Sequence, residues 1–165
     1  MEYKVHISGL ADGKYRYEFP IKDDFFITYA NDSIKGADLV AFVELEKGSG
    51  WMNLTCNVKG EITSYCDRCL EELVLPFDVS SNIAVKHAKL GEKIESEDDF
   101  LILDHSEGEL DLTQFLYDTI CVNIPMKKIH KEGECNQQMI SKLEQLNYSS
   151  SPLSQLKDML KAKEK

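Results

Sequence analysis

The sequence predicts an α+β protein with a predominantly antiparallel β-sheet, or a partial barrel, followed by C-terminal helices. Two observations predict this fold class: apolar residues alternate with polar ones as far as His87, and they follow helical spacing after Asp111. With 165 residues, of which 42% are hydrophobic, the chain is long enough to bury a sizeable core. The composition therefore excludes a chain that is disordered throughout.

The first half of the chain consists of extended runs separated by short turns. Tyr15, Tyr17 and Phe19 show the period-2 spacing of a half-buried strand, and later segments repeat it. The predicted strands are 15–19, 39–45, 52–58, 61–65, 71–79 and 82–88. Their short connections suit antiparallel neighbours. Trp51, which follows a Gly-Ser-Gly turn, is expected to be a core anchor, with an exposed contact as the alternative.

A strongly acidic segment follows the strands. From Glu92 to Asp111 the chain holds nine acidic residues and one basic residue, Lys93. Such a run repels itself, and we expect a solvated, mobile loop that contains a short strand at 100–103. The carboxylates lack the spacing of an EF-hand calcium loop, which disfavours a metal site there.

The first predicted helix begins at Asp111 and ends at Pro125. Asp111 and Gln114 stand at the two positions of a capping box. The apolar residues on one face of this helix are Leu112, Phe115, Leu116 and Ile120. A helix packed against the sheet is therefore expected.

Two further helices are predicted towards the C-terminus. One starts near Cys135 or Asn136 and stops at Asn147, and the other starts at Ser151 with Pro152 in its first turn. Their apolar stripes consist of Met139, Ile140, Leu143 and Leu146, and of Leu153, Leu156 and Leu160. The last helix is expected to dock on the sheet or to await a partner.

The chain therefore divides into two predicted regions. Residues 1–126 form an antiparallel sheet domain with one packed helix and an acidic loop at about 90–110, and residues 127–165 form a basic helical segment. Residues 1–120 contain 11 basic and 24 acidic side chains, whereas residues 121–165 contain 8 and 5. A net charge of −10 repels phosphate, so nucleic-acid binding requires a local basic face, which would lie C-terminally.

The first residues and the hydropathy of the chain predict the cellular compartment of the protein. The first ten residues lack the basic region and apolar stretch of a secretory signal. No apolar run approaches the roughly 20 residues of a membrane span. We therefore expect a cytoplasmic protein without a membrane partner.

The cysteines point to a metal site. Cys66 and Cys69 form a CxxC between two predicted strands, where a tight turn can bring two thiolates together as a zinc knuckle. The remaining cluster of suitable ligands is His130 and Cys135, and Cys135 lies at a predicted helix start, which favours its thiolate. Four protein ligands would make a closed, structural zinc site that clamps the helical segment to the sheet.

Other interpretations of these residues remain open. In one interpretation, Cys66 and Cys69 are simply reduced thiols in a turn. In another, they form a thioredoxin-like redox pair, although the thioredoxin-like motif lies at the start of a helix in a βαβ unit. Cys56 and Cys121 are expected to be core thiols. The other histidines, which are His6, His87 and His105, have no neighbours at ligand spacing. No nucleotide-binding loop, nucleophile elbow or HExxH motif is present, which disfavours an enzyme.

These residues carry a resemblance to a known family. The stretch GEITSYCDRCL at 60–70, then ELDL at 109–112 leading into a helix that ends NIPM at 123–126, resembles the bacterial YceD family of large ribosomal RNA subunit accumulation proteins. The leucine- and lysine-rich segment at 156–160 is similar too. Family members typically carry a second cysteine pair after the proline-methionine, where this chain has Cys135 alone, preceded by His130. Either His130 replaces a cysteine ligand, or the metal site has been lost.

The resemblance implies a non-enzymatic role in large-subunit ribosomal RNA accumulation and ribosome assembly, with no small-molecule substrate. Two partners fit the charges. Precursor RNA would contact the basic residues near the cysteines, which are Arg68, Lys127, Lys128 and Lys131, unless these form an ordinary solvated face. Alternatively, the acidic body would hold a basic ribosomal protein. A thiol-disulfide oxidoreductase that uses Cys66 and Cys69, or a plain interaction module, is the competing hypothesis.

Overall fold

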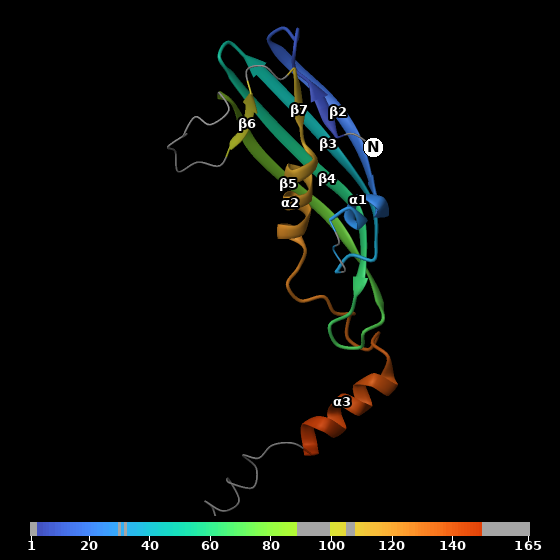
Figure 1. The fold of residues 1–165 in the computed structure, drawn as a ribbon. Helices are drawn as coiled ribbons and strands as arrows, with labels where there is room; N and C mark the ends of the chain where they lie inside the picture. Colours follow the sequence, from blue (N-terminus) through green and yellow to red (C-terminus); the bar gives the residue numbers. More distant parts are fainter. Residues whose placement is uncertain (1–2, 30, 32, 89–99, 105–107, 150–165) are drawn as a thin grey trace, which may run out of the picture. The chain divides into compact units, whose positions relative to one another are not determined.

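The computed structural model describes residues 3–29, 31, 33–88, 100–104 and 108–149. Its elements, in chain order (Figure 1), are β1 (Lys4–His6), β2 (Gly13–Lys22), α1 (Asp23–Ile27), β3 (Gly36–Gly48), β4 (Trp51–Tyr65), β5 (Glu72–Ala88), β6 (Phe100–Asp104), β7 (Glu109–Asp111), α2 (Thr113–Asn123) and α3 (Gln137–Ser149). They form two compact units: residues 1–64 with 74–126, and residues 65–73 with 127–165. Within the described stretches, no helix is both long and apolar enough to cross a membrane.

The first unit is built on a five-stranded sheet with the order β2-β3-β4-β5-β6 (Figure 1). The β2/β3 and β3/β4 pairs are antiparallel, and β6 joins β5 in parallel. A second sheet pairs β1 with β7. The predicted α+β class, with mostly antiparallel strands and C-terminal helices, is thus confirmed. Strands β1 and β7 were not predicted, because three residues are too few to show a period.

The predicted strands exist, but four of the expected runs merge into two long strands. Runs 52–58 and 61–65 belong to β4, and runs 71–79 and 82–88 belong to β5. In β4 the junction is Gly60, which pairs with Leu39 at a φ of +143°. Because glycine has no Cβ, the strand continues through this position, where another residue would break it.

The core of the first unit lies on one face of the large sheet. Buried sheet residues such as Leu39 and Leu54 belong to the same apolar cluster as Phe26 of α1 and Leu116 and Ile120 of α2. Val5 of β1 and Leu110 of β7 also belong to it. The short helix α1 was not predicted, yet it supplies two buried phenylalanines. The prediction that Trp51 is a core anchor is wrong: it is 53% exposed, because strand alternation puts its neighbour Met52 on the buried face of β4. One sheet face is therefore covered by the helices and by the small sheet.

Helix α2 begins later than predicted. The Asp111 carboxylate accepts hydrogen bonds from the N–H and the hydroxyl of Thr113, at 2.8 and 2.5 Å. The predicted capping box is wrong, because the Gln114 side chain donates to Asp118, one turn further on, instead. The predicted apolar face is confirmed: Leu112, Phe115, Leu116 and Ile120 are buried. The helix ends at Asn123, before Pro125.

The second unit contains α3, which begins where the sequence places it. Asn136 caps the helix, since its Oδ1 accepts the N–H groups of Gln138 and Met139 at 2.9 and 3.3 Å. The predicted stop at Asn147 is wrong, because α3 continues to Ser149. Met139 and Ile140 are half-buried, but Leu143 and Leu146 are exposed. The predicted third helix and most of the acidic segment lie outside the described residues.

Candidate metal centre

The turn between β4 and β5 forms a tight knuckle that holds Cys66 and Cys69. The Cys66 N–H donates to the Glu71 carbonyl at 2.8 Å, and the Leu70 N–H donates to the Cys66 carbonyl at 2.9 Å. Leu70 adopts a left-handed φ of +61°, which turns the following residues back, so that the Glu71 carbonyl meets the Cys66 N–H. Both cysteine side chains are buried. The backbone thus turns the two sulfurs inward from a short surface turn.

A second loop, residues 127–135, is hydrogen-bonded to this knuckle. The Asp67 N–H donates to the Lys128 carbonyl, and the Lys128 N–H donates to an Asp67 carboxylate oxygen, both at 2.6 Å. The Lys128 ammonium also lies 3.7 Å from that carboxylate. Sequence reasoning missed Asp67. The sequence feature that could have indicated its role is an acidic residue between the two cysteines of the turn, in a chain whose later segment at 127–131 is basic.

Four ligand atoms converge where the two loops meet. The ligand atoms of Cys66, Cys69, His130 and Cys135 all lie within 4.8 Å of one another. The Sγ atoms of Cys66 and Cys135 are 3.9 Å apart, and His130 Nδ1 lies 3.4 Å from Cys69 Sγ and 4.0 Å from Cys135 Sγ. A tetrahedral zinc ion with ordinary bond lengths would need S–S separations of about 3.8 Å and S–N separations of about 3.5 Å. The four residues are therefore close enough to hold one metal ion.

His130 is oriented by its second ring nitrogen. While Nδ1 faces the sulfurs, Nε2 lies 3.0 Å from the carbonyl oxygen of Glu72. A proton on Nε2 would satisfy that carbonyl and leave the Nδ1 lone pair directed at the sulfurs. Such a partner fixes the tautomer of a metal-binding histidine.

Hydrogen bonds lower the pKa of the Cys66 thiol. Burial raises the pKa of Cys66, but the backbone N–H groups of Cys69, His130 and Arg68 more than offset it and lower the pKa to about 6. The neighbouring Cys66 thiolate raises the pKa of His130. Burial and the nearby sulfurs raise the pKa of Cys135. Cys66 therefore favours its thiolate form, and a cation at the centre would relieve the repulsion between further thiolates.

An apolar shell surrounds the three sulfurs. Cys66, Cys69 and Cys135 pack together, and the half-buried side chains around them are Leu73, Ile129, Met139 and Ile140. The Asn136 amide donates to the Glu71 carboxylate at 2.6 Å, which ties the start of α3 to the knuckle. The first turn of α3 is therefore part of the site.

The four predicted cationic contact residues differ in their surroundings. Arg68 is exposed between the two knuckle cysteines, and Lys127 and Lys131 are exposed in the second loop. Within the described part of the chain, none of these three makes an ion pair. Lys128 is different: its side chain is only 19% exposed and pairs with Asp67. In the sequence, Arg68 directly follows Asp67 and Lys127 directly precedes Lys128, so each is next to one partner of the Asp67–Lys128 bridge.

The other cysteines and the one further histidine whose side chain is described are not members of this cluster. Cys56 is fully buried in the sheet core, and burial raises its pKa to about 11. Cys121 is half-buried and accepts a hydrogen bond from Asn31. His6 lies 3.1 Å from a carboxylate oxygen of Glu109. The side chains of His87 and His105 lie outside the described residues.

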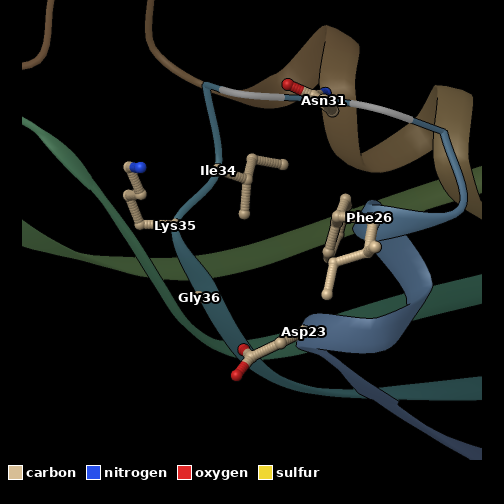
Figure 2. A pocket seen from close by; sticks show the side chains of 7 residues that line it. Asp23, Phe26, Asn31, Ile34, Lys35 and Gly36 are labelled. Atoms are coloured by element: carbon tan, nitrogen blue, oxygen red, sulfur yellow. The ribbon is translucent and has the colours of Figure 1, made fainter.

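A pocket beside α1 lacks a comparable set of donors. Figure 2 shows Asp23, Phe26, Asn31 and Ile34 around it, and its volume is about 250 Å³. Among the described residues that line it, the one carboxylate belongs to Asp23 and already accepts the N–H of Ala37 at 2.6 Å. These described lining residues therefore offer no set of metal-binding or nucleophilic groups comparable to the cysteine cluster.

We expect Leu70→Gly to stabilise the knuckle by roughly 0.5 to 1 kcal/mol. A left-handed φ destabilises the folded state by about 1 to 2 kcal/mol at a residue with a side chain. Glycine removes this strain, but it also raises the conformational entropy of the unfolded chain, which offsets part of the stabilisation. The Leu70 side chain is 66% exposed, so little burial is lost. Denaturant unfolding of the metal-loaded protein measures the change. Leu70→Ala, which keeps the strain, should show no gain, and a loss with glycine would refute the strain argument.

Comparison with known proteins gives one match. Residues 54–162 match the family model described as Large ribosomal RNA subunit accumulation protein YceD. The matched span covers more than half of the chain and includes both loops of the cysteine cluster. No curated protein and no solved structure matches the chain.

Proposed function

Because the chain belongs to the YceD family of large ribosomal RNA subunit accumulation proteins, we propose that it is a cytoplasmic, non-enzymatic factor in the accumulation of that RNA and in ribosome assembly. Its second unit would carry the RNA contact, with a structural zinc ion holding the contact surface in place. The observation that supports this is the convergence of four ligand atoms within 4.8 Å, from two loops that also carry exposed cationic residues.

The donor set fits zinc and a structural role. Three sulfurs and one imidazole nitrogen are ligands that zinc accepts in tetrahedral sites, and four protein ligands leave no position for a substrate. The ion would supply charge neutralisation and a cross-link between two loops far apart in sequence. The residues themselves provide the rest, since Glu72 orients His130 and the Asp67–Lys128 bridge aligns the loops.

The cationic surface would bind the phosphate backbone of precursor RNA. Arg68 and Lys127 are exposed, and Lys131 lies on the same loop as Lys127. Their placement beside the knuckle would give the otherwise acidic chain the local basic face that RNA binding requires. We assign Lys128 a structural role instead, because its ammonium pairs with Asp67.

We expect the double variant Arg68→Glu with Lys127→Glu to weaken binding to a large-subunit RNA fragment by at least tenfold. Each lost phosphate contact should also reduce the slope of log K against log salt by roughly 0.7 to 0.9. Filter binding at several salt concentrations measures both. Lys142→Glu, an exposed charge reversal on α3, is the control and should bind nearly as the wild type does. An unchanged affinity and slope in the double variant would reject this surface.

A second candidate partner is favoured by the charge of the first region. Residues 1–120 hold 24 acidic and 11 basic side chains, a surface that suits a basic ribosomal protein before assembly. If such a protein were the partner, the double variant would leave its capture unchanged, and capture would weaken as salt rises. Pull-downs with this protein as bait, from extracts with and without RNA, distinguish the two partners, because a ribosomal protein that binds directly is also captured without RNA.

A thiol-disulfide oxidoreductase remains the alternative from a different functional class. Cys66 and Cys69 lie in a turn between two strands, whereas the thioredoxin-like pair begins a helix. A closed zinc site should show no disulfide cycling across thiol buffers of different potential. A reversible two-electron transition of the purified protein would support the redox function instead.

A further inference from the structure

Two sulfurs of the candidate metal centre, one from each loop, lie almost in contact. The Sγ atoms of Cys66 and Cys135 are 3.9 Å apart, and both residues are buried. In a disulfide the two sulfurs would lie about 2.05 Å apart, so each would need to move by about 1 Å. The two cysteines are 69 positions apart in the chain, yet they belong to the same compact unit. A bond between them would therefore join the knuckle to the second loop.

The loops are also held together by groups that are not candidate metal ligands. The Asp67 N–H donates to the Lys128 carbonyl, and the Lys128 N–H donates to the Asp67 carboxylate, both at 2.6 Å. Asn136, which directly follows Cys135, donates to the Glu71 carboxylate at 2.6 Å. These bonds do not depend on a metal ion. The sulfurs of the two loops should therefore stay close together when zinc leaves.

The four ligand side chains divide into two close pairs. The Cys66 sulfur lies beside that of Cys135, whereas the Cys69 sulfur lies 3.4 Å from His130 Nδ1. A Cys66–Cys69 disulfide would give up the contact with the imidazole. It would also close a ring of four residues in a turn whose backbone is already fixed by the hydrogen bonds of Cys66 and Leu70. The arrangement therefore favours Cys135 as the disulfide partner of Cys66.

We propose that Cys66 and Cys135 are an oxidative modification site, at which a hydroperoxide converts the zinc cross-link between the two loops into a disulfide. This rests on the proposed function for the presence of zinc. Because the new bond joins the same two loops, oxidation would release the metal without separating the loops. Arg68 and Lys127 would thus stay on linked loops in an oxidised cell.

The reaction balances with hydrogen peroxide as the oxidant. One sulfur attacks a peroxide oxygen, so that an S–O bond forms, the O–O bond breaks, and the leaving hydroxide takes a proton and becomes water. The second sulfur then attacks the sulfenic sulfur, the S–S bond forms, the S–O bond breaks, and a second water leaves after protonation. The two thiolates lose two electrons, and the peroxide takes up these electrons and two protons from solvent. Cys69 and His130 alone no longer retain zinc.

Tryptic peptide mapping under non-reducing conditions identifies the bond directly. Trypsin cleaves after Arg68, so Cys66 and Cys69 fall on different peptides, 60–68 and 69–86, while Cys135 falls on 132–142. After treatment of the zinc-loaded protein with hydrogen peroxide, peptides 60–68 and 132–142 should be joined. The free thiols, titrated after denaturation, should fall from five to three, and a chromophoric chelator should detect one zinc ion released per chain.

Thermal unfolding tests whether the bond replaces the metal as a cross-link. A disulfide that closes a long loop restricts the unfolded chain strongly, so the oxidised, zinc-free protein should unfold at least about 5 °C above the reduced, zinc-free protein. Cys135→Ser should lose most of this gain. Cys121→Ser, which removes a half-buried thiol outside the cluster, is the matched control and should keep it.

The outcomes separate this inference from the proposed function. A bond from Cys69 to Cys66 or to Cys135 as the main product, or five thiols that survive the peroxide, would refute the modification site while the structural zinc and the RNA contact stand. If the purified protein holds no zinc, the structural zinc fails, and peptide mapping of the metal-free protein still decides which sulfurs join. A Cys66–Cys135 bond that forms in thiol buffers without peroxide would overturn both.

Discussion

Replacing Cys66 by serine should remove stoichiometric zinc from the purified protein and loosen the second unit. Hydrogen bonds lower the pKa of the Cys66 thiol, which lies 3.9 Å from that of Cys135 in the other loop, so its loss should break the metal cross-link between the loops. Loss of residues that merely orient ligands typically costs 10- to 100-fold in affinity, and a lost thiolate should cost roughly 100-fold or more. Elemental analysis and competition with a chromophoric chelator measure the affinity.

Matched variants identify the ligand set. Cys121→Ser removes a half-buried thiol outside the cluster and should leave zinc content unchanged. His130→Ala should lower the affinity, and His130→Cys should restore it by supplying a fourth sulfur. Zinc at full occupancy in Cys66→Ser would contradict the site, and zinc that survives His130→Ala at wild-type affinity would remove that residue from it.

Replacing Gly60 by alanine should destabilise the large sheet by roughly 3 kcal/mol or more, a loss of roughly 10 °C in Tm. An added Cβ would lie 2.1 Å from the carbonyl oxygen of Asp38 and 2.9 Å from the Cα of Leu39. Both atoms belong to the backbone of β3, so they cannot move without breaking the β3/β4 ladder. The φ of +143° adds strain for any residue with a side chain. Thermal unfolding followed by circular dichroism measures the change.

Gly50→Ala separates the two causes. Gly50 also has a positive φ, +88°, but a Cβ there would meet nothing within 4 Å. This variant should therefore lose only the conformational cost, about 1 to 2 kcal/mol. Equal losses in the two variants would contradict the steric argument at Gly60, and an unaffected Gly60→Ala would overturn it.

Local patterns predicted most of the regular structure. The alternation at 39–45 and the apolar face of Leu112, Leu116 and Ile120 are both found as predicted, because burial on one face imposes these periods. The failures have local causes as well. Strands β1 and β7 are too short to show a pattern, and α1 has five residues. The capping box failed because Gln114 bonds within its own helix.

Sequence alone determined the types of the candidate ligands and their spacing within each loop, because a CxxC in a turn and a histidine with a following cysteine are local features. It also determined the family. Only the tertiary structure decided that the two loops meet, that Asp67 and Lys128 join them, and that Glu72 orients His130. These contacts join residues about 60 positions apart, as in the Asp67–Lys128 pair. The backbone groups that take part in these contacts cannot be identified from the residue types, because every residue carries the same carbonyl and nearly every residue the same N–H.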